Sequence, residues 1–137
     1  TLYVHVSDQY SQYGAKSITS TERDATYVLD EILANETDLE LLEHTTDTHG
    51  YTDLLFALFN LSRKQLISRL RDIGSQKLCK IFSSSNPEFD QLNYPELRFN
   101  GLVNIDYLKK HAQELARVGA SLLTGTVTAS LLMSKLV

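Results

Sequence analysis

A short stretch near the middle of the chain, Glu43 to Asp53, carries the side chains best suited to chemistry. It runs Glu-His-Thr-Thr-Asp-Thr-His-Gly-Tyr-Thr-Asp, between a half-apolar run that ends at Leu42 and an apolar run that begins at Leu54. The pattern places Asp47 where a strand gives way to a helix. Functional groups often occupy such junctions, because the rigid elements on either side fix their direction.

Two kinds of metal chemistry fit this stretch. A carboxylate at the end of a core strand is a good ligand for Mg²⁺, and nucleases and polymerases use about three such carboxylates to hold two ions. The competing interpretation is a zinc-dependent hydrolase that uses His44, Asp47 and His49 as ligands. Strand alternation counts against it, because Asp47 and His49 project to one face of an extended strand and His44 to the other.

The composition is that of a single globular domain. The chain has 137 residues, 42% of them hydrophobic and 22% charged, and no apolar run approaches the roughly 18 residues of a membrane span. The one cysteine, Cys79, excludes an internal disulfide framework, suits a reducing cytoplasm and is expected to be a small buried residue. Because a strand pattern starts at once after Thr1, we expect a piece of a longer protein.

The charge is unevenly distributed. A net charge of −4 argues against a generic nucleic-acid binder, yet residues 63–80 hold six cations and one anion. Such a block is either a phosphate-facing patch or a solvated surface. If it lines a DNA path, its cations should lie on the same side of the domain as Asp47, with Arg69, Arg71 and Lys77 as the candidate DNA contacts.

The apolar spacing predicts a mixed α/β domain in the first half. Leu2, Val4 and Val6 alternate with polar residues, which predicts a strand with one apolar face and with His5 on the sheet surface. A capping-box-like start at Thr21 precedes a helical pattern. The predicted elements are a hairpin of 2–6 with 15–19, a helix over 21–35, a strand over 38–46 and a helix over 51–61. This order implies at least one parallel crossover.

The second half is predicted to be mostly helical. Residues 62–74 have no clear apolar period and are interpreted as a partly helical loop, and 77–82 as a strand. Both prolines fall within 83–100, which predicts a connecting loop. From Asn104 an apolar stripe at helical spacing continues to Gly125, which breaks it. One more helix is predicted over 126–137.

Several motifs together resemble one family, the Tn-three-family transposases, which are large bacterial enzymes of replicative transposition. Glu43 to Asp53 followed by Leu-Leu-Phe-Ala-Leu-Phe-Asn60 resembles their catalytic region. Further blocks resemble the family in the same order: Ser7-Asp-Gln-Tyr10, the helix start at 20–24, Arg69-Leu-Arg-Asp-Ile-Gly74 and Gly125-Thr-Val-Thr-Ala-Ser130. The resemblance covers nearly the whole chain, and only 60–68 departs from it.

The resemblance implies a ribonuclease-H-like mixed sheet with flanking helices, incomplete at both ends, and a DDE carboxylate triad that binds two Mg²⁺ ions. The middle carboxylate maps onto Asp47, the first Asp onto a strand upstream of Thr1, and the Glu onto a helix beyond Val137. Residues 1–137 are then expected to be one domain, a catalytic-domain fragment in which 83–137 form a mostly helical insertion or extension. With one carboxylate of three, the isolated fragment is expected to be inactive.

The same resemblance implies the activity of the parent protein. It would nick transposon ends with metal-activated water and join the freed 3′-hydroxyl to target DNA. Its expected partners are the terminal inverted repeats, target DNA and further copies of itself, in the bacterial cytoplasm and without a membrane. Thr48 and His49 are candidates to support the metal ligand or contact DNA. A remaining alternative is a non-catalytic DNA-binding or assembly module, in which Asp47 only caps a helix.

Overall fold

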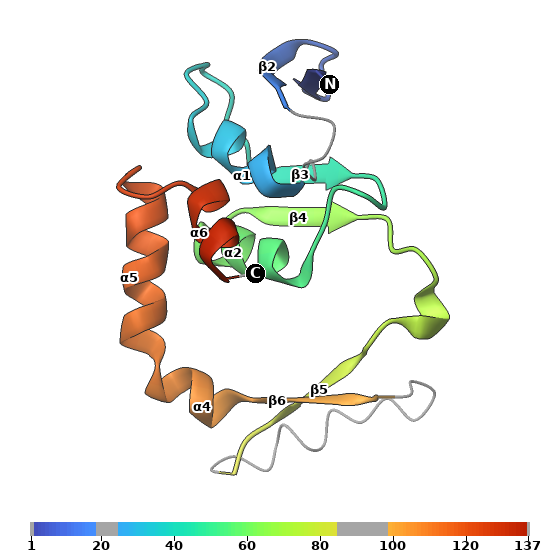
Figure 1. The fold of residues 1–137 in the computed structure, drawn as a ribbon, viewed down its shortest axis with the longest axis vertical. Helices are drawn as coiled ribbons and strands as arrows, with labels where there is room; N and C mark the ends of the chain where they lie inside the picture. Colours follow the sequence, from blue (N-terminus) through green and yellow to red (C-terminus); the bar gives the residue numbers. More distant parts are fainter. Residues whose placement is uncertain (1, 19–24, 85–98, 137) are drawn as a thin grey trace. The chain divides into compact units, whose positions relative to one another are not determined.

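The computed structural model describes residues 2–18, 25–84 and 99–136 (Figure 1). The chain divides into two compact units. The first unit comprises residues 1–70 and 117–137, and the second comprises residues 71–116. Both units mix helices with short strands, so the predicted α/β class is confirmed. No helix in the described part of the chain is long and apolar enough to cross a membrane.

The first unit begins with the predicted hairpin. Strand β1 (Leu2–Val6) pairs antiparallel with β2 (Gln12–Ser17), and Val4 lies opposite Ala15. The second strand starts earlier than the predicted Ala15, because a bulge after His5 lets pairing continue to Gln12. Tyr10 adopts a positive φ of 61° in the connecting turn.

The burial of β1 is opposite to the expectation. His5 is 2% exposed, whereas Leu2 and Val6 are 66% and 55% exposed. The prediction of His5 as a sheet-surface residue is therefore wrong. The reason is tertiary: helix α1 (Ala25–Leu33) packs against β2, and the rings of Tyr3 and Tyr13 lie within 4.9 and 5.4 Å of the His5 ring.

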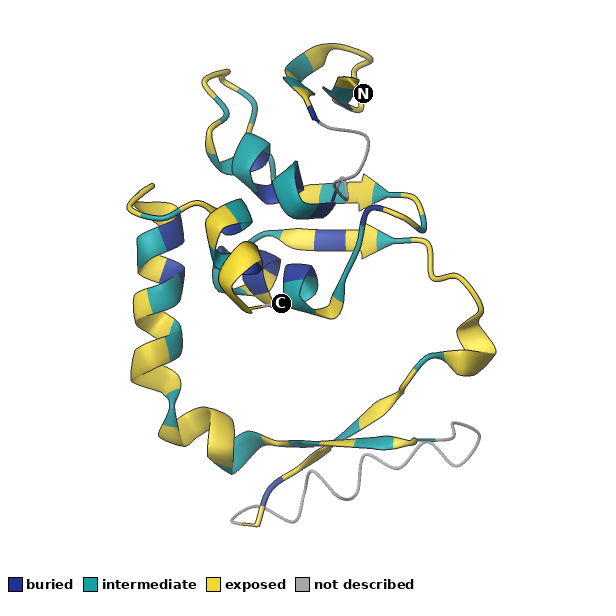
Figure 2. Cartoon of the chain, viewed as in Figure 1, coloured by how far each residue is buried: buried dark blue, intermediate teal, exposed yellow. Residues whose placement is uncertain are grey.

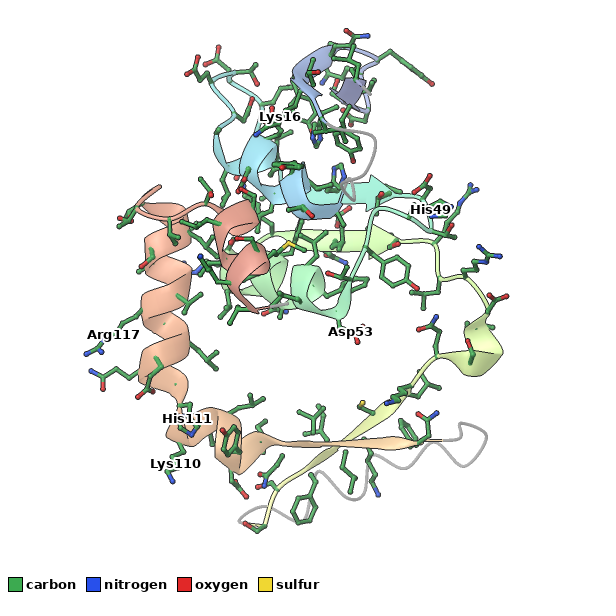
Figure 3. All side chains as sticks on the ribbon, viewed as in Figure 1. Lys16, His49, Asp53, Lys110, His111 and Arg117 are labelled. Atoms are coloured by element: carbon green, nitrogen blue, oxygen red, sulfur yellow. The ribbon has the colours of Figure 1, made fainter. Side chains whose placement is uncertain are left out.

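A parallel strand pair follows the hairpin. Strand β3 (Glu43–Thr46) is shorter than the predicted 38–46, and it pairs in parallel with β4 (Gln65–Ser68). Helix α2 (Asp53–Leu61) connects the two strands, with Asp53 labelled in its first turn (Figure 3). The partly helical loop predicted for 62–74 is thus wrong over β4. The apolar residues of this segment show neither helical nor strand periodicity. Pairing with β3 and the burial of Leu66 make it a strand.

The core of the first unit lies between its helices. Buried apolar residues come mainly from four helices, as the dark blue positions on α1 and α2 illustrate (Figure 2): α1, α2, the last turns of α5 (Ala112–Leu123) and the start of α6 (Ala129–Leu136). They include Ala25, Val28, Leu29, Leu55, Leu58, Phe59, Leu122 and Ala129. Gly119 lets α5 approach the end of α2, because an added Cβ would lie 3.0 Å from the carbonyl oxygen of Leu61. Gly125 ends α5 with a φ of 67°, as its sequence position predicts.

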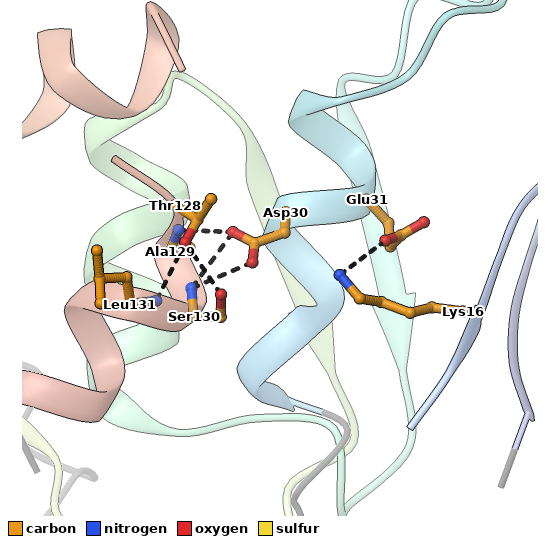
Figure 4. Close-up of polar contacts among 7 residues, drawn as sticks. All are labelled: Lys16, Asp30, Glu31, Thr128, Ala129, Ser130 and Leu131. Atoms are coloured by element: carbon orange, nitrogen blue, oxygen red, sulfur yellow. Dashed lines mark hydrogen bonds and ion pairs between the residues drawn. The ribbon is translucent and has the colours of Figure 1, made fainter. Parts of the chain in front are cut away.

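Asp30 joins α1 to the start of α6 (Figure 4). Its Oδ1 accepts hydrogen bonds from the backbone N–H of Ala129 at 2.6 Å and of Ser130 at 3.3 Å. The hydroxyl of Thr128 accepts a further one from the N–H of Leu131. A carboxylate at a helix N-terminus satisfies free N–H groups and complements the helix dipole. Asp30 therefore fixes α6 against α1 from a position about a hundred residues away in the sequence.

The second unit contains a short helical turn, η1 (Ile73–Ser75), and the parallel strands β5 (Cys79–Phe82) and β6 (Gly101–Asn104). The strand predicted over 77–82 is confirmed at β5, but Cys79 is exposed and not buried as expected. Strand β6 was not predicted. The helix expected from Asn104 is two helices, α4 (Ile105–Lys110) and α5, which meet at His111. The predicted helix start at 20–24 and most of the 83–100 loop lie outside the described residues.

Candidate functional site

Asp47 lies where the sequence predicts it, directly after the last residue of β3. The parallel register pairs Thr46 with Ser68, so Asp47 and Arg69 are the next positions at the carboxyl edge of the pair. The backbone N–H of Arg69 donates to the carbonyl of Thr46 at 3.2 Å, which holds the two chain segments together there. Both side chains are exposed. A carboxylate and a guanidinium thus share one solvent-facing strand edge.

The turn after β3 orients the Asp47 carboxylate. Its Oδ1 accepts hydrogen bonds from the backbone N–H groups of His49 at 2.9 Å and Gly50 at 3.2 Å. An added Cβ on Gly50 would lie 1.8 Å from the hydroxyl of Thr46, so the turn can close only around glycine. Among the described residues these are the bonds that the carboxylate makes, and they leave Oδ2 available to a ligand.

Helix capping does not account for Asp47. The N-cap of α2 is Thr52, whose hydroxyl accepts from the backbone N–H of Leu55 at 3.1 Å. Asp53 occupies the first turn, where a negative charge complements the helix dipole. The alternative that treats Asp47 only as the cap of the following helix is therefore wrong.

The other polar residues of the stretch divide between two environments. His49 is exposed on the turn after β3 (Figure 3), and Thr48 beside it is half-buried. His44 instead stacks on Phe59 of α2, with ring centroids 6.1 Å apart. No group of three or more His, Cys, Asp or Glu side chains in residues 2–18, 25–84 and 99–136 is placed to hold a metal ion. The zinc set of His44, Asp47 and His49 is not assembled there.

The contact between His5, which is buried, and His44, which is half-buried, could not be foreseen from the sequence. The rings of His5 and His44 lie 5.2 Å apart, and the Nε2 atom of each is buried without a hydrogen-bond partner among the described residues. The Nδ1 of His5 lies 3.3 Å from the hydroxyl of Tyr13. Alternation within β1 signals that His5 faces away from the valines, but no local pattern tells which face is covered.

Burial makes protonation of these histidines unfavourable. Desolvation, together with the nearby His5, lowers the pKa of His44 to about 4. Desolvation also lowers the pKa of His5, against an opposing effect of the Glu31 carboxylate. Burial raises the pKa of the Tyr13 hydroxyl. Both imidazoles are therefore neutral at neutral pH, so each offers one N–H donor and one acceptor nitrogen.

The basic block is divided between the two ends of β4 and the second unit. Arg69 shares the strand edge with Asp47, whereas Arg63 and Lys64 precede β4 and lie at its opposite end. The Lys64 ammonium donates to the carbonyl of Leu41 at 2.6 Å. The length of β4 thus separates these two cations from Asp47, whereas Arg69 lies beside it. Arg71 and Lys77 are exposed residues of the second unit, where Arg71 pairs with Asp72 at 3.3 Å.

Comparison with known proteins gives a consistent result. A family model described as "Tn3 transposase DDE domain" matches residues 1–137. The chain is 40% identical over 136 residues to the transposase for transposon Tn21 of Escherichia coli. It is 41% identical over 137 residues to that for Tn501 of Pseudomonas aeruginosa, and 41% over 138 residues to that for Tn1546 of Enterococcus faecium.

The matched relatives are much longer than this chain. Each of the three alignments covers 98–99% of the chain and 13% of the relative. No solved structure matches the chain.

Proposed function

Because the chain belongs to the Tn3 transposase DDE-domain family, we propose that it is part of the catalytic domain of a bacterial DNA transposase. The parent enzyme cleaves transposon ends and transfers the 3′ ends to target DNA by metal-dependent phosphodiester chemistry. The chain spans about 13% of the length of its curated relatives, so most of the parent lies outside it.

The position of Asp47 is the observation that carries this proposal. It is an exposed carboxylate at the carboxyl edge of a parallel strand pair, in a turn that fixes one oxygen and leaves the other available. Ligands of α/β folds commonly bind at this edge, because the strands end and loops begin there. We assign Asp47 as the middle carboxylate of the DDE triad and as a metal ligand.

The residues of this chain fit a role in holding Mg²⁺ as a partial ligand set. Carboxylate oxygens are the ligands that Mg²⁺ prefers, and Asp47 supplies one such group. The first Asp and the Glu of the triad belong to other parts of the parent. When bound, two Mg²⁺ ions would stabilise the attacking and leaving oxygens of the phosphodiester. The role of this chain is to hold the Asp47 carboxylate in a fixed direction through the amides of His49 and Gly50.

A ribonuclease-H-like architecture is the fold we propose for the complete domain. The element order supports it: an antiparallel hairpin, a helix, and a strand–helix–strand unit with parallel strands. In such a domain the two strand pairs belong to one mixed sheet. We further propose that the fragment is inactive alone, and that residues 83–137 are a mostly helical extension whose last part, 117–137, packs into the core of the first unit.

DNA is the partner implied by this chemistry, as terminal inverted repeats and as target, with self-association of the parent during assembly. The site of action is then the bacterial cytoplasm. Thr48 and His49 lie in the Asp47 turn, and we propose them as residues that support the carboxylate or contact the DNA backbone. Arg69 is the cation that shares the Asp47 strand edge, where a phosphate would be bound.

A change of metal preference tests the ligand role of Asp47 directly. In the parent transposase, Asp47→Cys should lose strand transfer with Mg²⁺ and recover part of it with Mn²⁺, because a thiolate binds the softer ion better than the harder one. Strand transfer of plasmid-borne transposon ends is measured in each metal. Equal activity of the Cys variant in both ions would contradict direct ligation, and Asp53→Cys serves as the matched control.

The salt dependence of DNA binding tests the basic residues. We expect Arg69→Gln to reduce the slope of log affinity against log salt by about one unit, and the triple substitution Arg69/Arg71/Lys77→Gln by up to about three, because each lost phosphate contact releases one counterion fewer. Base preference should change little, since phosphate contacts carry no sequence information. Binding of the parent to end DNA is titrated at several salt concentrations.

Arg63→Gln is the control for this measurement. It removes the same charge from the opposite end of β4 and should leave the slope unchanged. A slope that responds equally to Arg63 and Arg69 would indicate a long-range effect of net charge and not a phosphate contact at the Asp47 edge.

A further inference from the structure

The turn between β1 and β2, residues 7–11, presents a large aromatic ring almost entirely to solvent. Tyr10 is 93% exposed and adopts a φ of 61°. In this left-handed conformation the Cβ of an L-residue crowds the following carbonyl oxygen, so glycine usually occupies the position in hairpin turns. Tyr10 thus combines a strained backbone with an uncovered ring. Neither feature stabilises the folded chain by itself.

Hydrogen bonds within the turn hold this conformation in place. The backbone N–H of Tyr10 donates to the carbonyl of Ser7 at 3.0 Å, and the N–H of Ser7 donates to the carbonyl of Ser11 at 2.8 Å. The hydroxyls of Ser7 and Ser11 share a hydrogen bond of 2.8 Å. Backbone strain that the surrounding structure fixes is concentrated at functional positions. The ring of Tyr10 is therefore held in advance in the position that a contact would require.

The β1–β2 turn lies at the end of the first unit that is remote from Asp47. Residues 3–9 and 39–45 line one groove, in which the rings of His5 and His44 lie 5.2 Å apart. The lining reaches four residues past His5 but only one past His44, so β1 and β3 run in opposite directions. The turn that follows β1 is therefore level with the segment before β3, whereas Asp47 follows β3 at its other end.

The surroundings of the turn are acidic. Asp8 is exposed in the turn itself, and Glu40 and Glu43 are exposed in the segment that is level with it. The groove lining of 3–9 and 39–45 includes these three carboxylates and neither lysine nor arginine. Within the described part of the chain, none of the three is paired with a cation. Such a surface repels DNA phosphates and attracts a cationic group.

We propose that the β1–β2 turn is a docking site for an arginine of the parent polypeptide outside residues 1–137, whose guanidinium stacks on the Tyr10 ring and pairs with Asp8. A guanidinium is planar, stacks on aromatic faces and forms hydrogen bonds with carboxylates, so it matches both side chains. The proposal rests on the proposed function, because it requires that the chain be a fragment of a longer transposase. Each relative extends far beyond the matched 13%, which supplies the polypeptide that docks.

Two other occupants fit the turn less well. DNA is disfavoured by the three carboxylates and by the distance of the turn from the Asp47 edge, where the phosphodiester chemistry is proposed. A second copy would cover Tyr10 only after assembly, so the strain and the exposed ring would be uncompensated in every free monomer. A contact within one polypeptide forms as soon as the parent is folded and does not depend on its concentration.

Hydroxyl-radical footprinting of the full-length transposase tests whether the turn is covered. The radicals oxidise accessible tyrosine rings, and mass spectrometry of the peptide that contains Tyr10 gives the oxidation rate. We expect this rate to be several times lower than in the urea-unfolded parent, without DNA and at every protein concentration. A rate equal to that of the unfolded chain would overturn the proposal. So would protection that is lost on dilution, which indicates a second copy, or protection that requires end DNA.

The substitution Tyr10→Gly tests the contact by the sign of its effect. Glycine relieves the left-handed strain, so in an uncovered turn it would slow amide exchange in residues 2–6 and 12–17 by about fivefold or more. We expect exchange in the parent to become faster instead, by about threefold or more, because the lost stacking of a desolvated guanidinium outweighs the relief of strain. Slower or unchanged exchange would overturn the proposal.

Arg63→Gly is the matched control for this substitution. Arg63 is exposed, has a φ of 56° and follows the C-cap of α2, a position that glycine also favours. Its replacement should slow amide exchange in the last turn of α2. This result would show that relief of left-handed strain is measurable in the parent.

Three further variants test the chemistry of the contact. Tyr10→Phe keeps the face of the ring and should keep the wild-type exchange rate, whereas Tyr10→Leu keeps only apolar bulk and should accelerate exchange. Asp8→Asn should also accelerate it. The double variant Asp8→Asn/Tyr10→Leu should accelerate exchange by less than the product of the two single effects, because both residues hold one guanidinium.

Two results would overturn the arginine. Wild-type exchange in Tyr10→Leu would indicate an apolar contact without a cation, and multiplicative effects in the double variant would show that Asp8 and Tyr10 have no common partner. None of these measurements depends on strand transfer. If the turn proves to be uncovered while Asp47→Cys still recovers activity with Mn²⁺, the proposed function stands without this contact.

Discussion

Asp47→Asn in the parent transposase should reduce strand transfer by about a thousandfold or more while leaving binding to transposon ends within about twofold. Asparagine keeps the size of the side chain and an oxygen that can accept from the amides of His49 and Gly50, so the turn should persist. It loses the charge that a Mg²⁺ ligand supplies. Metal stabilisation of phosphoryl oxygens is worth several kcal/mol, and each 1.4 kcal/mol is a factor of about ten in rate.

Two assays and one control separate chemistry from structure. Strand transfer is measured on labelled transposon ends, and end binding by gel shift in Ca²⁺, which binds oxygen ligands of the same kind. Asp53→Asn is the matched control, because Asp53 is a carboxylate of the same stretch that lies in the first turn of α2. If binding and transfer fell together in Asp47→Asn, the carboxylate would be structural and the catalytic assignment would be refuted.

Acidification should destabilise the domain through His44. Its pKa is lowered to about 4 in the folded chain, against 6.5 for the free side chain. Above pH 6.5 the imidazole is neutral in both states and has no differential effect. Between pH 6.5 and 4 the unfolded state binds a proton that the folded state does not, so the free energy of unfolding falls as pH falls. The loss is at most about 3 kcal/mol, and partial exposure of the ring reduces it. The lowered pKa of His5 acts in the same direction.

This effect is measured by urea unfolding of the parent at pH 7.5 and pH 5. We expect His44→Phe to reduce the difference between the two pH values, because the group that titrates in the unfolded state is gone. His49→Phe removes an exposed histidine from the neighbouring turn and should leave the difference intact. An equal pH dependence in wild type and His44→Phe would show that other groups control the acid sensitivity.

Local sequence patterns were sufficient for elements that carry their own signal. The β1–β2 hairpin, the apolar helical stripe of α1, the helix after Asp53 and the break at Gly125 were all predictable from spacing and turn chemistry. Strands β4 and β6 were not. Each is four residues long and pairs in parallel with a strand that lies more than twenty residues earlier in the chain. Parallel pairing depends on a partner strand that is distant in the sequence, so the apolar pattern within the segment does not predict it.

The candidate site was predictable to a similar extent. The position of Asp47 after a strand followed from the change of pattern around it, and the resemblance suggested the catalytic role that we propose for it. The difference between Arg69 and Arg63 could not be seen, because both belong to one basic run and only the register of β4 separates them. The burial of His5 could not be predicted either, because a strand pattern does not show which of its two faces a helix will cover.

The carboxylate of Asp30 has a consequence for how the polypeptide folds as it is synthesised. It ties α1 to the start of α6, so the core around Val28 and Leu29 is complete only when Ala129 and Met133 have joined it. Residues 71–116, which form the second unit, lie in the sequence between the two segments of the first unit. The entropy cost of closing a loop grows only with the logarithm of its length, so a long segment between the two parts of the first unit costs little additional free energy. A nascent chain from which α6 has not yet emerged therefore holds α1 and α2 with part of their apolar surface uncovered, and exposed surface of this kind favours aggregation.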